Sequence, residues 1–197
     1  LLTALAAFGI GNMVQANSVA AALQATFHVP TWMTGLALVV LTAVVILGGI
    51  KSIANVTQWL VPFMALFYLG GALIVLVLYA GQLPHAFRLI FEGAFSGTAA
   101  VGGVAGSTMM LALRYGIARG LFSNEAGLGS APMVHAAADT DHPVRQGMYG
   151  IFEVFVDTIL ICSTTALVII VTGVWNSGAT GAALSAKAFE TGLPGTF

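Results

Sequence analysis

The sequence predicts an all-α polytopic membrane protein, and three observations lead to that fold class. The 197-residue chain is 58% hydrophobic and only 7% charged, whereas soluble domains carry about 25% charged residues. No charged residue precedes Lys51, and none lies between Lys51 and Arg88. Apolar runs recur at about 20 residues, the length that a helix needs to cross a bilayer. So few charges cannot cover the surface of a soluble domain, which excludes that class.

The apolar runs predict five spans, the fourth of them broken. They cover about residues 1–27, 32–50, 59–79, 108–138 and 148–173. His28-Val29-Pro30 predicts the first turn, because proline disfavours helix in the residue before it. The chain begins and stops within apolar sequence, so we expect residues 1–197 to be an interior fragment of a single transmembrane domain.

The segments between the spans are more polar or richer in glycine. Residues 51–58 predict a polar turn, and residues 81–106 predict a short amphipathic helix that lies on the surface or covers a vestibule. The glycine- and alanine-rich residues 174–197 predict an exposed connection.

Residues 116–132 are the stretch around which the chain is organised. They combine four glycines with Arg119, Ser123, Asn124 and Glu125 inside a very apolar protein. Glycine costs a helix about 1 kcal/mol relative to alanine, and Ser and Asn compete for backbone hydrogen bonds. This mixture predicts a helix that breaks within the bilayer, as in transporters that bind their substrate at such a break. A surface loop between two helices is the alternative.

The first span has a polar centre. Asn12, Gln15 and Ser18 are spaced by three residues, which places them along one stripe of a helix. Such a stripe either packs against another helix through hydrogen bonds or faces a polar cavity. The residues alone leave both interpretations open.

Two carboxylates fall in the last span. Glu153 and Asp157 are four residues apart, on one helical face. Ionisable groups within a span are costly and are functional candidates. Because Glu153 follows Arg145 by only eight residues, we expect Glu153 to lie near the membrane edge, close to Arg145. Asp157 remains open.

Motifs for enzymatic chemistry are absent from the sequence. No GxSxG, HExxH or CxxC occurs, and Cys162 is the single cysteine. We therefore expect no catalytic residues, no cofactor and no disulfide framework. The net charge of −1 argues against nucleic acid as a partner.

Several long motifs, taken together, resemble the sodium:alanine symporter family, within the amino acid–polyamine–cation transporter group. They read FGIGNMVQANS, GGIKSIANVTQWLVPFMALFY, RGLFSNEAGLGSAP, HAAA, HPVRQG and VFVDTILICSTTAL. The resemblance covers nearly the whole chain in the family's order and spacing. The family's GTGNI-type broken first helix and the helix that would follow Phe197 are absent.

The resemblance implies a partial LeuT-type five-plus-five inverted-repeat fold. The chain would supply the third to seventh helices of a ten-helix core, with the broken sixth helix around residues 120–130. It also implies a multi-pass protein of the cell membrane, inner or plasma, surrounded by the lipid bilayer. In this fold a principal sodium site lies between the first and eighth helices, so the main sodium ligands would lie outside the chain.

The resemblance further implies sodium-coupled symport of alanine or glycine. A zwitterion needs N–H donors and oxygens, both of which a helix break exposes, and the next half-helix favours the anionic end. We expect substrate contacts from Asn12, Gln15, Phe122, Ser123, Asn124 and Gly127. Among these, Gln15 would hydrogen-bond the substrate and Phe122 would close the side-chain pocket. A non-transporting helix-packing or sensor module is the alternative function, and a channel is a third.

Overall fold

The computed structural model of the chain describes residues 9, 12–95, 104–125, 129–193 and 195, and all regular elements among them are helical. η2 is a π-helix, whereas η1 and η3 are short 3-10 helices. In chain order the elements are α2 (Met13–Phe27), α3 (Thr31–Leu47), α4 (Gly49–Leu78), η1 (Ala80–Gln82), α5 (Leu83–Phe95), α6 (Val104–Ser123), α7 (Ser130–His135), α8 (Pro143–Phe155), η2 (Val156–Cys162), α9 (Ser163–Val171), η3 (Val174–Asn176) and α10 (Gly181–Gly192).

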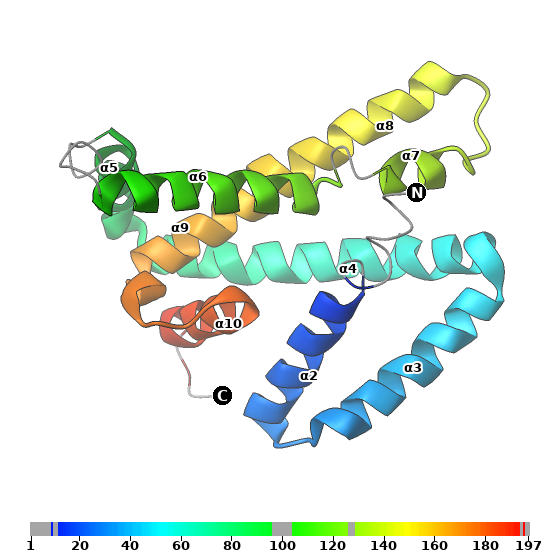
Figure 1. Ribbon diagram of the computed structural model, residues 1–197, viewed down its shortest axis with the longest axis horizontal. Coiled ribbons are helices and arrows are strands. Elements are labelled where there is room, and N and C mark those ends of the chain that lie inside the picture. The colour runs from blue at the N-terminus through cyan, green and yellow to red at the C-terminus, as the bar shows by residue number, and fades with distance from the viewer. Residues whose placement is uncertain (1–8, 10–11, 96–103, 126–128, 194, 196–197) are drawn as a thin grey trace.

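α2 and α3 form a V-shaped helical hairpin (Figure 1). α2 ends where His28 adopts a left-handed conformation with φ 57°, and the His28 N–H still donates to the Gln24 carbonyl at 3.1 Å. Pro30 then precedes α3 and has no N–H to extend the earlier helix. The chain therefore turns at the predicted tripeptide.

α4 is a continuous helix of 30 residues, so the polar turn predicted at residues 51–58 is wrong. The chain turns earlier, at Gly49, whose φ of 72° suits glycine. No glycine or proline follows until Pro62, so nothing stops the helix there. Thr57 donates its hydroxyl to the Ile53 carbonyl of the same helix, at 2.9 Å. Pro62 thus lies inside the helix instead of in its first turn.

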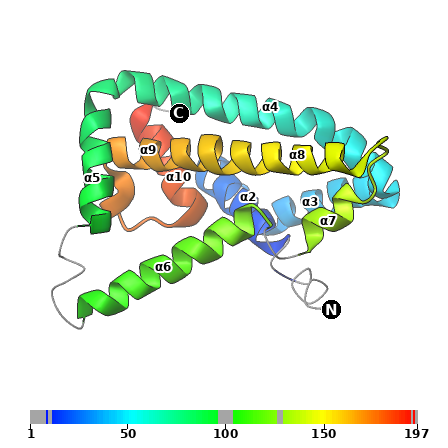
Figure 2. The same ribbon diagram turned by 90° about the horizontal axis from the view of Figure 1, so that it is seen from above.

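A second long helix combines α8, η2 and α9 over Pro143–Val171 (Figure 2). It and α4 are the two described helices that are both long and apolar enough to cross a membrane. At 1.5 Å per residue each is about 45 Å long, more than the roughly 30 Å of a hydrocarbon core. Only 11% of the apolar window of each is buried within the structure. They are therefore not buried core helices of a soluble domain.

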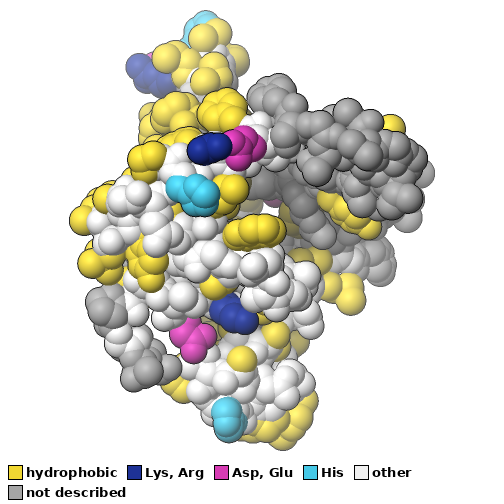
Figure 3. All heavy atoms as spheres, turned by 90° about the vertical axis from the view of Figure 1, so that its left-hand side faces the viewer, with side chains coloured by type: hydrophobic (Ala, Val, Ile, Leu, Met, Phe, Trp, Pro, Cys, Tyr) yellow, Lys and Arg dark blue, Asp and Glu magenta, His cyan; other side chains and the backbone are white. Residues whose placement is uncertain are grey.

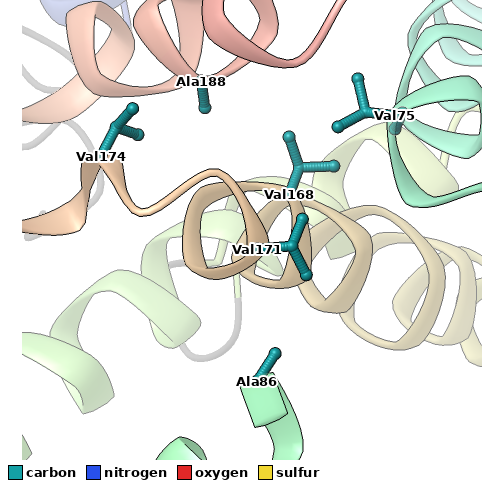
Figure 4. Close-up of a cluster of buried hydrophobic side chains, with 7 residues drawn as sticks. Val75, Ala86, Val168, Val171, Val174 and Ala188 are labelled. Carbon is teal, nitrogen blue, oxygen red and sulfur yellow. The ribbon is translucent and has the colours of Figure 1, made fainter. Parts of the chain in front are cut away.

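The buried core surrounds α9 (Figure 4). Val168 and Val171 of α9 meet side chains from four other elements, and Figure 4 shows these side chains converging around this helix. The partners are Ala72 and Val75 of α4, Ala86 of α5, Val174 of η3 and Ala188 of α10. α9 is therefore the centre of the packing in the described structure.

The described C-terminal residues 174–193 are packed through η3 and α10, so the exposed connection predicted for residues 174–197 is wrong over that range. α10 buries Ala188 completely, and the Phe189 ring meets the Tyr68 ring of α4 edge to face at 5.3 Å. Tyr68 also shares a 2.5 Å hydrogen bond with Thr165 of α9. These contacts tie α4, α9 and α10 together.

α5 is the short helix expected between residues 81 and 106. Its Ala86 faces the core, while Arg88 and Glu92 pair on its exposed side at 2.6 Å. The hydrogen bond that Arg88 donates to Glu92 raises the pKa of Arg88 above its ordinary value. The described atoms at this end of the molecule are mostly hydrophobic or uncharged, with a few scattered charges (Figure 3).

Candidate functional site

The candidate site is the interruption between α6 and α7. α6 continues to Ser123 and α7 begins at Ser130, so the chain leaves and re-enters helix within the predicted stretch. The interruption is shorter than that stretch, because Gly116 and Gly120 lie inside α6. Their cost in helix propensity, about 1 kcal/mol each, does not end the helix.

Asn124 closes the end of α6. Its backbone N–H donates to the Gly120 carbonyl at 3.2 Å, and its side-chain Nδ2 donates to the same oxygen at 2.9 Å. One of the carbonyls left over at a helix end thus receives two donors. An asparagine at this position therefore supplies its own C-terminal cap.

Glu125 follows in a left-handed conformation, with φ 51°. That region is uncommon for a residue with a Cβ, and such residues gather at functional sites. The Glu125 carboxylate accepts a 2.5 Å hydrogen bond from Ser130 Oγ, at the first turn of α7. This bond links the two sides of the interruption.

The end of α6 is joined to η2 by two side-chain hydrogen bonds. Ser123 Oγ donates to Asp157 Oδ2 at 2.5 Å, and Thr158 Oγ1 donates to Asn124 Oδ1 at 2.9 Å. Cys162 Sγ lies 3.9 Å from Ser123 Oγ. Asp157, which the sequence left open, therefore contacts a predicted site residue.

α7 is joined to α8 through His135. Gln146 Nε2 lies 2.7 Å from His135 Nδ1, and His135 Nε2 lies 3.2 Å from Glu153 Oε2. The Gln146 amide nitrogen faces His135 Nδ1, and the Glu153 carboxylate faces Nε2. The partner of Arg145 is instead Asp141, at 2.9 and 3.0 Å, so Glu153 pairs with His135 and not with Arg145.

The structure describes five of the six predicted substrate residues. Phe122 and Asn124 are half-buried and Ser123 is exposed, all three at the end of α6. Asn12 and Gln15 are exposed, and no hydrogen bond joins their side chains to any described residue. Gly127 lies outside the described residues.

The predicted stripe on the first span is only partly present. α2 begins at Met13, so Asn12 precedes the helix, and Ser18 donates its hydroxyl to the Val14 carbonyl of α2 itself. In Figure 1, α2 lies below α4 and α6 lies above it. No hydrogen bond among the described residues brings Gln15 to the interruption. The predicted meeting of Gln15 with residues 122–124 therefore stays a prediction.

Surface hollows lined by described residues also occur away from the interruption. One runs along α3 and is lined by Trp32, Leu36 and Val40, and another lies at the end of α10 beside Lys187 and Glu190. Neither includes a predicted substrate residue. Among the described residues, no group of three or more His, Cys, Asp or Glu side chains is placed to hold a metal ion.

These features define a class of protein. Two apolar helices long enough to span a bilayer accompany an interrupted helix whose polar end is joined to one of them. Irregular backbone at membrane depth is tolerated where protein or a wet cavity surrounds it, which is how transporters hold their substrates. The class is thus an α-helical membrane protein with an interrupted helix.

The comparisons with known proteins name the family within that class. The whole chain, residues 1–197, matches the sodium:alanine symporter family, and the chain belongs to it. The family and the relatives below are transporters and not enzymes.

Three relatives illustrate the likeness. The chain is 47% identical to the sodium/alanine symporter AgcS of Methanococcus maripaludis, over 97% of this chain and 42% of the relative. It is 44% identical to an uncharacterized transporter of Haemophilus influenzae, over 94% of this chain and 41% of the relative. It is 39% identical to the probable sodium/glutamine symporter GlnT of Bacillus subtilis, over 90% of this chain and 37% of the relative. The chain thus spans about two fifths of the length of these relatives.

Proposed function

We propose that the full-length protein containing this chain is a sodium-coupled symporter that carries alanine or glycine across the cell membrane. Membership of the sodium:alanine symporter family supports the reaction class. The observation that carries the assignment to this chain is the interruption between α6 and α7. The helix ends on its two sides leave carbonyl acceptors and N–H donors without helical partners, and a zwitterionic substrate needs both.

The substrate contacts remain those proposed from the sequence. Phe122 is half-buried directly before the interruption, which suits a wall that limits the space for the substrate side chain. Gln15 is exposed on α2, and no described residue forms a hydrogen bond with its side-chain amide. An amide of this kind supplies both a donor and an acceptor for a substrate. Asn12, Ser123, Asn124 and Gly127 complete the proposed set.

Sodium is cargo in this proposal and not a cofactor. We assign its main ligands to helices outside residues 1–197, on the LeuT-type arrangement that the resemblance implies. In that arrangement the chain supplies the third to seventh helices of a multi-pass protein. The support for this placement is the order of the helices, with α6 and α7 as the two halves of the sixth.

Uptake by the purified full-length protein in liposomes tests the proposal. Labelled alanine should accumulate saturably under an inward sodium gradient, and replacing sodium by choline should abolish accumulation. Glycine should compete and leucine should not. Because one relative is named as a probable glutamine symporter, glutamine is the informative third competitor. Alanine uptake that is equal with and without sodium would overturn the proposal.

A further inference from the structure

The helix that faces the interruption is itself irregular at the point of contact. Residues Val156–Cys162 form a π-helix between α8 and α9. A π-helix hydrogen-bonds from i to i+5, and such turns occur frequently at functional sites. In an α-helix, residues five apart point about 140° away from each other. In a π-helix they come close to the same face.

The contacts with α6 use that register. Asp157 and Cys162 are five residues apart, and both lie close to Ser123 Oγ, at 2.5 and 3.9 Å. The next residue, Thr158, bonds the next residue of the partner, Asn124, at 2.9 Å. Two consecutive residues of the π-helix therefore hold two consecutive residues at the end of α6.

A further hydroxyl supports the irregular turn. Ser163 Oγ donates to the Thr158 carbonyl at 3.2 Å. The Ser163 hydroxyl thus gives the Thr158 carbonyl a side-chain donor five residues along the chain. The turn at Thr158 is thus supported from the same helix that presents Thr158 to Asn124.

One donor and one acceptor of the Asn124 side-chain amide are already engaged. Its Nδ2 donates to the Gly120 carbonyl and its Oδ1 accepts from Thr158, so both ends of the amide are held. The single hydroxyl proton of Ser123 is donated to Asp157. These bonds hold both side chains in place at the end of α6. Each side chain keeps capacity for a ligand, because Asn124 retains a second N–H and Ser123 retains an oxygen lone pair.

We propose that Asp157 and Thr158 are positioning residues, which set the substrate site by locking Ser123 and Asn124 at the end of α6. The inference rests on the proposed function and deepens it. Asp157 acts as a hydrogen-bond acceptor for Ser123, and its negative charge is not what the site requires. The π-helix brings Asp157 and Cys162 to the same side, beside Ser123.

A double-mutant cycle on the full-length protein tests this coupling. We expect Asp157→Ala and Ser123→Ala each to weaken alanine binding about tenfold at saturating sodium, which is about 1.4 kcal/mol. The double variant should lose little more than either single variant, because the bond is already broken. Losses that multiply to about a hundredfold would show that the two residues act separately and would overturn the proposal.

Asp157→Asn provides the conservative rescue. The asparagine oxygen still accepts the Ser123 hydroxyl, so alanine affinity should stay within about fivefold of wild type. A loss as large as that of Asp157→Ala would mean that the charge itself is needed, and the positioning role would be wrong. If Asp157→Ala does not fold, Thr158→Val tests the second bond, because it removes the donor to Asn124. It should weaken alanine binding, and unchanged affinity would overturn the proposal.

Thr165→Val is the matched control. It removes a 2.5 Å side-chain bond from the same helix, between α9 and Tyr68 of α4, away from the interruption. It should lower the unfolding temperature and leave alanine affinity unchanged. Equal loss of affinity in Thr165→Val would show that any destabilisation of this helix impairs the site, contrary to the proposal.

Failure of the proposed function has a separate signature. If wild-type protein binds no alanine with sodium present, the function is wrong. The Ser123–Asp157 coupling is then measured by the unfolding temperatures of the same four proteins. Non-additive changes in unfolding temperature would still support coupling between Ser123 and Asp157. Additive changes would show that the two residues are not coupled.

Discussion

A methyl group added at Gly192 is expected to separate α10 from α4. An ideal Cβ on Gly192 would lie 2.6 Å from Val75 Cγ1, 3.0 Å from Val75 Cγ2 and 3.1 Å from Thr172 Cγ2. Val75 is completely buried and, as a β-branched residue, has little freedom at χ1. The clash therefore cannot be relieved by a rotamer change alone, and one of the helices must move.

The expected cost of Gly192→Ala follows from that geometry. Overpacking a well-packed core costs about 1–3 kcal/mol. The full-length protein in detergent should therefore show a lower apparent unfolding temperature than wild type, compared at one fixed scan rate because unfolding of such proteins is often irreversible.

Val75→Ala is the matching change. It removes the two methyl groups that the new Cβ would strike, at a cost of about 1.5–3 kcal/mol for the buried surface and cavity. The double variant should lose less free energy of unfolding than the two single variants lose together, because the smaller Val75→Ala side chain makes room for the new Cβ.

Gly70→Ala in α4 is the control for this pair. No described atom lies within 4 Å of its added Cβ, so it should keep or raise the unfolding temperature through helix propensity. The packing of α10 on α4 would be refuted if Gly192→Ala behaved like Gly70→Ala, or if its effect were additive with that of Val75→Ala.

Two further predictions concern substrate binding by the full-length protein. Gln15→Leu should weaken alanine affinity by about 1–3 kcal/mol, the cost of leaving a buried partner unpaired, with little change in folding; unchanged affinity in a titration would return Gln15 to helix packing. Phe122→Ala should shift the ratio of alanine to leucine affinities toward leucine, by no more than about 1–3 kcal/mol per methylene. Competition binding measures that ratio, and an unaltered ratio with a lower folded yield would remove Phe122 from the site.

Local composition was sufficient to locate the interruption. Residues 116–132 combine glycine, Ser, Asn and Glu in an apolar setting, which disfavours a continuous membrane helix. α6 does stop within that stretch, at Ser123. The same rule overestimated the effect of Gly116 and Gly120, which remain helical. Propensity costs of this size are readily outweighed by helical hydrogen bonds in an apolar environment.

Composition also misjudged two connections. Residues 51–58 are polar but contain no glycine or proline, so α4 runs through them. Residues 174–197 are rich in small residues, which suggests a weak helix, yet Ala188 and Gly192 are what allow α10 to pack closely on its neighbours. The small size of these side chains allows α10 to pack closely, and the polarity of the segment does not predict that packing.

The lock at the interruption was beyond sequence reasoning for a different reason. Ser123 and Asp157 are 34 residues apart, and no local pattern pairs them. The π-helix that brings Asp157 and Cys162 to one face follows neither the 3.6-residue nor the 2-residue period on which sequence patterns depend. The available signal was a carboxylate within a span, which marks Asp157 as a candidate without naming its partner.

Coupling between the two cargoes is the central claim, and sodium flux driven by alanine tests it most directly. Liposomes containing the full-length protein, with equal sodium on both sides and labelled sodium outside, receive an inward alanine gradient. A symporter should accumulate labelled sodium above equilibrium while the alanine gradient lasts, and leucine should not replace alanine. Labelled sodium that only equilibrates, with or without alanine, would indicate a channel, and no alanine-dependent flux at all would contradict the account.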